Sequence, residues 1–176
     1  MNLYLRLLTL MLRARRAPKI SLWDEARTPF RVWPNDLDIF RHMNNARYLG
    51  LLDLGRTDLM ERSGFAKTIK DRGWYPVVGA QTITYKRSLK LWNRFIVTTR
   101  VLGFDDRAVY MAQEFRRGGK LCARAVVQAR FLKRTGGTVD MAELIAASGS
   151  VPSDRMTLPD WIPAWSAAVR ISSTDG

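Results

Sequence analysis

Two carboxylates, a histidine and two asparagines are gathered in one short segment, D-L-D-I-F-R-H-M-N-N-A-R-Y, at residues 36–48. His42 is the only histidine of the chain. A carboxylate can activate a water molecule or attack a carbonyl carbon itself, and a histidine can position either group. The segment therefore has residue types suited to chemistry at an acyl carbonyl, such as that of a thioester.

The same segment leads into a predicted helix, which runs from about Ala46 to Ser63, with Asn44 or Asn45 as its cap and Gly64 as its stop. The first turn of a helix exposes unpaired backbone N–H groups and the positive end of the dipole. Such groups stabilise the oxyanion that develops when a carbonyl is attacked. From the residues alone a structural alternative stays open, in which the polar side chains only cap the helix and close turns.

Five strand-like runs accompany this helix, and short turns rich in glycine and aspartate join the later ones as hairpins. The order is one strand, the helix, and then four antiparallel strands. We expect an α+β fold in which a five-stranded antiparallel sheet wraps around one long central helix. Gly50 and Gly55 would then mark places where the sheet presses closely on the helix. The runs are Thr28–Pro34, Val77–Lys86, Arg94–Leu102, Ala108–Phe115 and Leu121–Leu132.

The chain divides into an apolar-basic arm (residues 1–20), the domain with the helix and strands (residues 21–134) and a C-terminal tail (residues 135–176). The tail is rich in proline and tryptophan, and we expect it to be irregular and to pack on the domain. The arm is an amphipathic helix, too short to span a bilayer and without a secretory cleavage site. It packs on its own domain or a dimer partner, or it is a peripheral membrane helix with arginines on anionic head groups.

The net charge of +13 calls for an anionic partner or a solvated surface. Nucleic acid is disfavoured, because no helix-turn-helix, zinc-finger or base-stacking signature accompanies the charge. The lone cysteine, Cys122, lies in a strand-like run and is expected to be a half-buried structural thiol. Without a cysteine framework or a cysteine–histidine cluster, we expect a reducing, cytoplasmic compartment and no structural zinc.

The run D-L-D-I-F-R-H-M-N-N-A-R-Y-L, followed by L-L-D-L-G-R, resembles the signature of the 4-hydroxybenzoyl-CoA thioesterase-like branch of the hotdog superfamily. That branch has an aspartate four residues before a His-x-Asn-Asn-Ala-x-Tyr-Leu run at the start of the central helix. The later Y-P-V-V-G-A-Q-T-I-T-Y-K-R-S-L is similar to the second strand of the family. The likeness extends over about residues 30–133 and leaves out the arm and the tail. The matching residues are Asp38, His42, Asn44, Asn45, Ala46, Tyr48 and Leu49.

The resemblance implies a hotdog fold and a thioesterase acting on acyl-coenzyme A or an acyl-carrier thioester. Asp38 would be the general base or nucleophile, and backbone amides near residues 44–46 would polarise the carbonyl. The family needs no metal or redox cofactor. Hotdog domains form dimers, or dimers of dimers, with two sites at the subunit interface.

Other residues keep two interpretations each. His42 positions Asp38 or water, or packs beside the loop. Asn44 and Asn45 are helix caps and loop ties, or Asn45 takes part in catalysis and Asn44 binds the substrate together with Ala46 and Tyr48. Lys86 and Arg87 bind the phosphates of the coenzyme or are plain surface charge.

Asp36 is expected to form a turn, and Asp53 with Arg56 a local ion pair. The chain departs from the family pattern at Phe40, Arg41 and Gly50, where many relatives have small residues or glycine at the first two positions and glutamate at the third. A bulky Phe40 would reshape the acyl pocket.

Two further functions compete with hydrolysis. A hotdog enoyl-CoA hydratase or dehydratase also uses aspartate and histidine, but its histidine follows the aspartate by five residues in a Gly-Asp-x-Asn-Pro-x-His run. Here the spacing is four and the Asn-Pro step is absent. A non-catalytic acyl-CoA or lipid-binding protein, held at the inner face of a membrane by its arm, is the other alternative.

Overall fold

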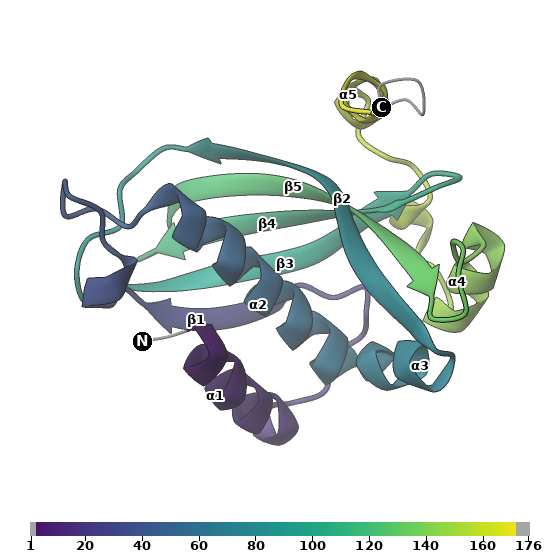
Figure 1. The fold of residues 1–176 in the computed structure, drawn as a ribbon, viewed down its shortest axis with the longest axis horizontal. Coiled ribbons are helices and arrows are strands. Elements are labelled where there is room, and N and C mark those ends of the chain that lie inside the picture. Colours follow the sequence, from purple (N-terminus) through teal and green to yellow (C-terminus); the bar gives the residue numbers. More distant parts are fainter. Residues whose placement is uncertain (1–2, 172–176) are drawn as a thin grey trace.

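A long helix, α2, lies across one face of an antiparallel sheet in the computed structural model, which describes residues 3–171 (Figure 1). The sheet has five strands in the order β1-β3-β4-β5-β2, so β1 and β2 form its two edges. The predicted architecture of one central helix and five antiparallel strands is confirmed. The elements are α1 (Leu3–Arg16), β1 (Ala26–Arg31), a 3-10 turn (Pro34–Asp36), α2 (Asn45–Ser63), α3 (Phe65–Asp71), β2 (Trp74–Tyr85), β3 (Arg94–Phe104), β4 (Val109–Arg117), β5 (Lys120–Lys133), α4 (Met141–Ser148), a second 3-10 turn (Ser153–Arg155) and α5 (Trp161–Ala168).

Local sequence explains both ends of α2. The side chain of Asn44 accepts a hydrogen bond from the Ala46 N–H at 2.9 Å, which satisfies one orphan amide of the first turn. Gly64 ends the helix with φ of 78°, a left-handed conformation that glycine adopts without steric cost. Helical spacing predicts an apolar inner stripe for this helix, and the stripe is buried against β3, β4 and β5. Its members are Tyr48, Leu51, Leu52, Gly55 and Leu59.

The two glycines of α2 have different surroundings. A Cβ atom at Gly55 would lie 2.8 Å from Thr99 Oγ1 and 3.0 Å from Gln113 Nε2, so the sheet does press on the helix there. A Cβ atom at Gly50 would meet only the side chain of Leu3, at 3.5 Å. The expectation that Gly50 also marks close approach of the sheet is therefore wrong, because this residue faces α1.

The arm is a helix that packs on its own domain. Arg6, Leu10 and Ala14, four residues apart, form its buried face, and α1 contacts α2. Arg6 belongs to a set of residues whose three- and four-residue spacing predicts the polar side of this helix, together with Thr9, Arg13 and Arg16. Its guanidinium is instead buried, because Asp36 lies opposite it.

The C-terminal tail is more regular than the expected irregular segment, since it contains α4 and α5. Asp140 caps α4 by accepting a hydrogen bond from the Ala142 N–H at 2.8 Å. Ile162 of α5 is buried against Tyr110 and Val126, side chains on the sheet face opposite α2. These helices gain stability from that contact more than from helix propensity, so the sequence signal for them is weak.

Candidate functional site

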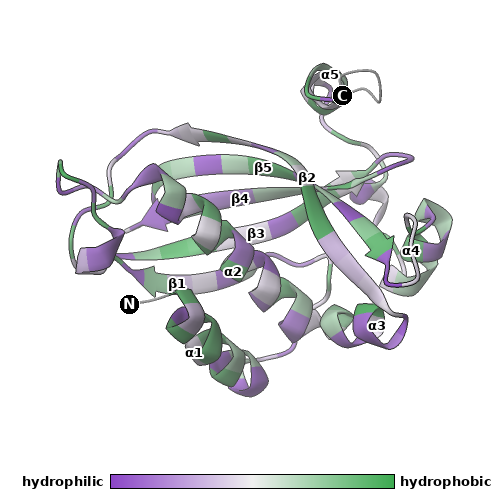
Figure 2. Ribbon diagram, viewed as in Figure 1, coloured by the Kyte–Doolittle hydropathy of each residue, from purple (hydrophilic) through white to green (hydrophobic). Residues whose placement is uncertain are grey.

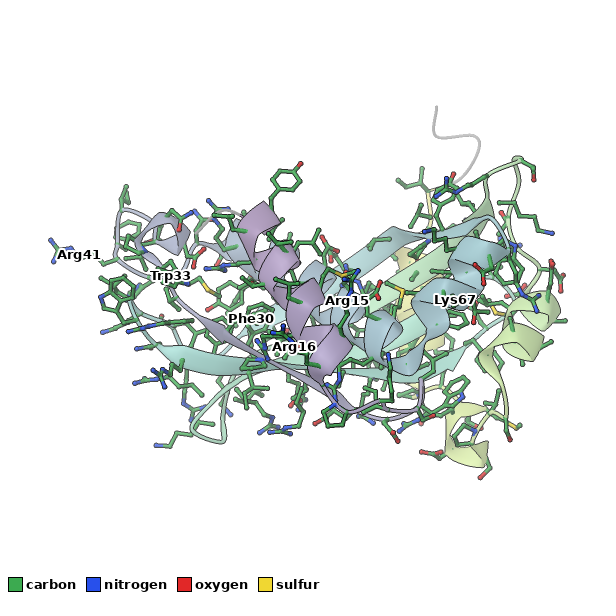
Figure 3. The ribbon with its side chains drawn as sticks, turned by 90° about the horizontal axis from the view of Figure 1, so that it is seen from below. Arg15, Arg16, Phe30, Trp33, Arg41 and Lys67 are labelled. Carbon is green, nitrogen blue, oxygen red and sulfur yellow. The ribbon has the colours of Figure 1, made fainter. Side chains whose placement is uncertain are left out.

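The residues between the first 3-10 turn and α2 form a narrow projecting loop, residues 37–43. Leu37 and Met43 pair at its base, and the Asp38 N–H donates to the His42 carbonyl at 2.9 Å. Ile39 and Phe40 at its tip are 89% and 73% exposed. Arg41 has a φ of 60°, and its side chain extends away from the body of the molecule (Figure 3).

Asp38 is fixed within this loop by its own neighbours. Its Oδ1 accepts hydrogen bonds from the backbone N–H of Phe40 at 2.9 Å and of His42 at 3.1 Å. Among the residues that the structure describes, none donates to Oδ2. The carboxylate is half-buried. One oxygen therefore holds the group in place, and the other is available to a water molecule or a ligand.

The start of α2 offers fewer open amides than its sequence suggests. The Asn44 N–H donates to the Asp36 carbonyl at 2.8 Å, and the Ala46 N–H donates to the Asn44 side chain. No acceptor within the described part of the chain takes the Asn45 N–H. Of the three amides considered for polarising a carbonyl, that of Asn45 is thus the uncommitted one.

The loop with Asp38 lies beside the β2–β3 connection, residues 86–93. His42 pairs with Lys90, and the Met43 N–H donates to the Leu89 carbonyl at 2.8 Å. Lys86 and Arg87 begin this connection, and both side chains are exposed. Arg87 Nη1 donates to the Leu121 carbonyl at 2.8 Å, so part of its guanidinium is used to hold the turn.

The remaining predicted site residues are placed as follows. The half-exposed His42 is tied to Asp38 through its backbone N–H, and Asn45 is exposed at the first position of α2. The ring of Tyr48 is 3% exposed and packs against Tyr85 and Phe115, with centroids 5.0 and 4.7 Å away. Burial raises the pKa of Tyr48 to about 12. Contact of these residues with a substrate stays a prediction.

Asp36 closes a turn, as expected, and does more. Its Oδ2 accepts from the Trp33 N–H at 2.8 Å and forms an ion pair with Arg6 of α1. Both side chains are nearly inaccessible to solvent. This pair could not be predicted from the sequence, because a contact between residues so far apart depends on the tertiary fold.

An apolar cavity, also unforeseen, lies at the opposite end of α2. The C-terminal half of α2, the inner face of the sheet, β2 and α4 enclose it, and Asp38 is not among its lining residues. The predicted Asp53–Arg56 ion pair is found at its edge. Arg56 Nη1 also donates to the buried Gln113 side chain at 2.7 Å, and burial lowers the pKa of Arg56.

A sequence profile described as the thioesterase-like superfamily matches residues 32–166. The chain belongs to this superfamily. The matched residues include the loop with Asp38, helix α2 and strands β2 to β5. Within the described residues, no group of histidine, cysteine, aspartate and glutamate has the arrangement of a metal site.

Similar proteins agree with this assignment. Protein THEM6 of Xenopus laevis is 39% identical over 113 residues, which cover 64% of this chain and 55% of that protein. Among solved structures, the probable thioesterase YbaW of Escherichia coli superposes with a TM-score of 0.65 at 24% identity, over 69% of this chain and 94% of that one. The gentisyl-coenzyme A thioesterase BH1999 superposes with a TM-score of 0.60 at 15% identity, over 73% and 98% of the two chains. The fold of this superfamily member is the hotdog fold, as the sequence predicted.

Proposed function

We propose that this protein hydrolyses acyl-coenzyme A thioesters and that Asp38 is the reacting carboxylate. The observation that carries the proposal is the state of the Asp38 side chain, with one oxygen bound by two backbone amides and the other free of partners in the described residues. The restraint orders the group before substrate arrives, and the free oxygen can accept a proton or form a bond.

Hydrolysis at this site needs only ordinary acyl-transfer steps. As general base, Asp38 takes a proton from water while the water oxygen bonds to the thioester carbon. The tetrahedral intermediate then breaks its C–S bond, and the leaving sulfur takes the proton from Asp38, which releases the acid and the thiol and restores the carboxylate. As nucleophile, Asp38 would form an acyl anhydride and expel the thiol, and water would then cleave the anhydride. The Asn45 N–H at the positive end of α2 would stabilise the oxyanion in either route.

The β2–β3 connection beside Asp38 is a basic loop that would bind the coenzyme part of the substrate. Lys86, Arg87 and Lys90 bring three positive charges to the connection that pairs with His42. Phosphate groups of coenzyme A match such a cluster. A coenzyme A thioesterase among the structural neighbours supports this choice of thiol.

A homodimer would complete the site. Strand β2 is an edge of the sheet, and apolar side chains of this strand are exposed, including Tyr75, Val78 and Tyr85. An unprotected edge of this kind favours pairing with another strand. Pairing of β2 with its copy would extend the sheet across two subunits and cover these side chains.

A panel of acyl-coenzyme A thioesters tests the proposed activity. The purified chain is mixed with short, medium, long and aromatic acyl-coenzyme A, and release of free thiol is followed by a thiol-reactive dye. We expect turnover well above the spontaneous rate for at least one class. Absence of turnover across the panel would contradict the proposal and would favour a non-catalytic lipid-binding protein.

One observation favours a peripheral membrane location in addition. Leu5, Leu8 and Leu12 of α1 recur at helical spacing and are 53%, 57% and 46% exposed on the side away from the domain. Figure 2 shows this helix as largely apolar, with polar residues where it ends. Arg13, Arg15 and Arg16 form that basic end, and no acid occurs before Asp24.

We propose that this leucine stripe rests in the head-group region of an anionic bilayer, with the three arginines on lipid phosphates. None of the described helices has the length and apolarity needed to cross a bilayer. Sedimentation with vesicles containing phosphatidylglycerol should be lost when Leu5, Leu8 and Leu12 are changed to serine, and kept when the exposed Met156 and Val169 are changed instead. A stripe that mediates self-association without vesicle binding would contradict this placement.

A further inference from the structure

The cavity at the C-terminal half of α2 has the properties of a binding site for an aliphatic chain. Its solvent-accessible volume is about 200 Å³. The lining is almost wholly apolar, with Leu59, Met60, Val101, Met111 and Phe131 among its members. Ligand pockets in proteins commonly have this character, with mostly apolar side chains and a small number of polar groups.

Most polar groups of the lining are already hydrogen bonded within the protein; among the described residues the exception is the buried indole N–H of Trp23. Thr57 Oγ1 donates to the Asp53 carbonyl at 3.0 Å, and Ser148 Oγ donates to the Ile145 carbonyl at 2.8 Å. The Arg56 guanidinium is shared between Asp53 and Gln113. The cavity therefore presents mainly apolar surface to a ligand. A water molecule would find few hydrogen-bond partners there.

The mouth of the cavity is defined by its exposed lining residues. Asp53 on α2 and Pro76 and Val78 on β2 are exposed, whereas Leu59 and Leu144 are 1% and 4% exposed. The opening therefore lies between α2 and the edge strand β2. Antiparallel pairing of β2 with its copy would set the two α2 helices side by side in opposite directions. The Asp38 loop of one subunit would then lie toward the cavity mouth of the other.

The depth of the cavity sets the length of the chain that it can hold. Asp53 and Met60 are seven residues apart on α2, a distance of about 10 Å along the helix axis. An extended covalent chain advances roughly 1.3 Å per bond, the value implied by 3.8 Å over the three bonds between successive Cα atoms. About eight carbons would therefore reach from the mouth to the closed end.

We infer that this cavity receives the acyl chain of the thioester and selects an unbranched aliphatic chain of about eight carbons. The inference deepens the proposed function and rests on it for the identity of the head group. The half-buried Met60 of α2 and Met141 of α4 line the cavity and pack in one cluster with the buried Leu144, so these side chains would set the limit for the chain. The selecting wall thus comes partly from the C-terminal tail, outside the sheet and its central helix.

Two substitutions move the closed end in opposite directions. Met60→Trp adds volume and shortens the cavity, and Met141→Ala removes volume and lengthens it. Met156→Trp is the matched control, because Met156 is 64% exposed and does not line the cavity. Each variant is compared with the wild-type chain by circular dichroism. If Met60→Trp does not fold, Met141→Ala carries the test alone.

The first readout is kcat/KM for saturated acyl-coenzyme A substrates of four to sixteen carbons. We expect an optimum near eight carbons that moves to shorter chains in Met60→Trp and to longer chains in Met141→Ala, with changes of about tenfold or more for chains two carbons from the new optimum. Met156→Trp should keep the wild-type profile. A profile that stays unchanged in the folded cavity variants would overturn the inference.

The second readout does not depend on turnover. Binding of free fatty acids of six to fourteen carbons is measured by calorimetry on the Asp38→Asn chain, with the same three substitutions added. Binding that follows the same length shifts, together with no thioester hydrolysis by the wild-type chain, would support the cavity assignment and refute the proposed hydrolysis. Hydrolysis without length shifts would refute the assignment alone.

Discussion

Arg6 of α1 and Asp36 of the first 3-10 turn form an ion pair whose side chains are only 4% and 2% exposed. The same carboxylate accepts from the Trp33 N–H, and the Asp36 carbonyl accepts from the Asn44 N–H at the start of α2. One residue thus links the arm, the turn and the helix that leads from the Asp38 loop. The arm is consequently an integrated part of the domain.

Removal of one partner of this pair should be costly. Arg6→Ala leaves the Asp36 carboxylate buried with only a distant second cation, Arg47 at 4.0 Å. We expect a loss of about 3–5 kcal/mol in the free energy of unfolding, the usual cost of an uncompensated buried charge. Urea titration measures it. Lys67→Ala, which removes an exposed pair with Asp71 on α3, should leave the urea midpoint unchanged. Equal midpoints for the wild-type chain and Arg6→Ala would contradict the structure.

We expect alanine substitution at the two glycines of α2 to change the free energy of unfolding in opposite directions. Gly55→Ala places a methyl group against Thr99 and Gln113 and should lower the free energy of unfolding by about 1–3 kcal/mol. Gly50→Ala meets only ordinary contact with Leu3, so the better helix propensity of alanine should raise stability by about 0.5–1 kcal/mol. Thermal denaturation of both variants checks the order, and a more stable Gly55→Ala would contradict the close contact.

Tyr48 should make stability fall at alkaline pH. Burial raises its pKa from 10.0 to about 12, so the folded chain keeps the phenolic proton at pH values where the unfolded chain loses it. The contribution is complete below pH 10 and is lost as the pH rises toward 12, by up to about 2–3 kcal/mol. Tyr48→Phe has no such proton. Urea midpoints at pH 9 and pH 11 should therefore differ more in the wild-type chain than in Tyr48→Phe, and identical pH dependence would refute the assignment.

The basic loop should act on the coenzyme rather than on the acyl group. Changing both Lys86 and Arg87 to alanine is expected to raise KM for acyl-coenzyme A about tenfold, the equivalent of about 1.4 kcal/mol of lost binding. A short thioester of the same acid without the nucleotide should be little affected. Lys67→Ala with Lys70→Ala on α3 is the charge-matched control. An equal rise in KM for both kinds of substrate would mean that these residues do not bind the coenzyme.

The sheet and the central helix could be predicted because their signals are local. Alternation in each strand, the cap at Asn44 and the stop at Gly64 lie within a few residues of the elements that they define. The same holds for the loop that carries Asp38, where the family signature is continuous in sequence. Local patterns therefore sufficed for the fold and for the position of the candidate carboxylate.

Other features depend on contacts between distant parts of the chain. The Arg6–Asp36 pair joins two segments thirty residues apart, and burial of Arg6 reversed the polarity expected for the arm. The cavity depends on α4, whose Leu144 packs with Phe65 and Phe131. Sequence periodicity does not report such tertiary neighbours. The capping pattern of Asp140 with Glu143 three residues later was the one local sign of α4.

Asp38→Asn tests the central claim most directly. An asparagine Oδ1 can still accept from the Phe40 and His42 amides, so the loop and the thermal midpoint should be preserved. The lost charge removes the group that activates water or attacks the thioester, and kcat should fall about 100- to 10,000-fold on the best acyl-coenzyme A substrate. Asp24→Asn, at an exposed position away from this loop, should keep wild-type kcat. A folded Asp38→Asn protein with kcat within a few fold of wild type would contradict the account.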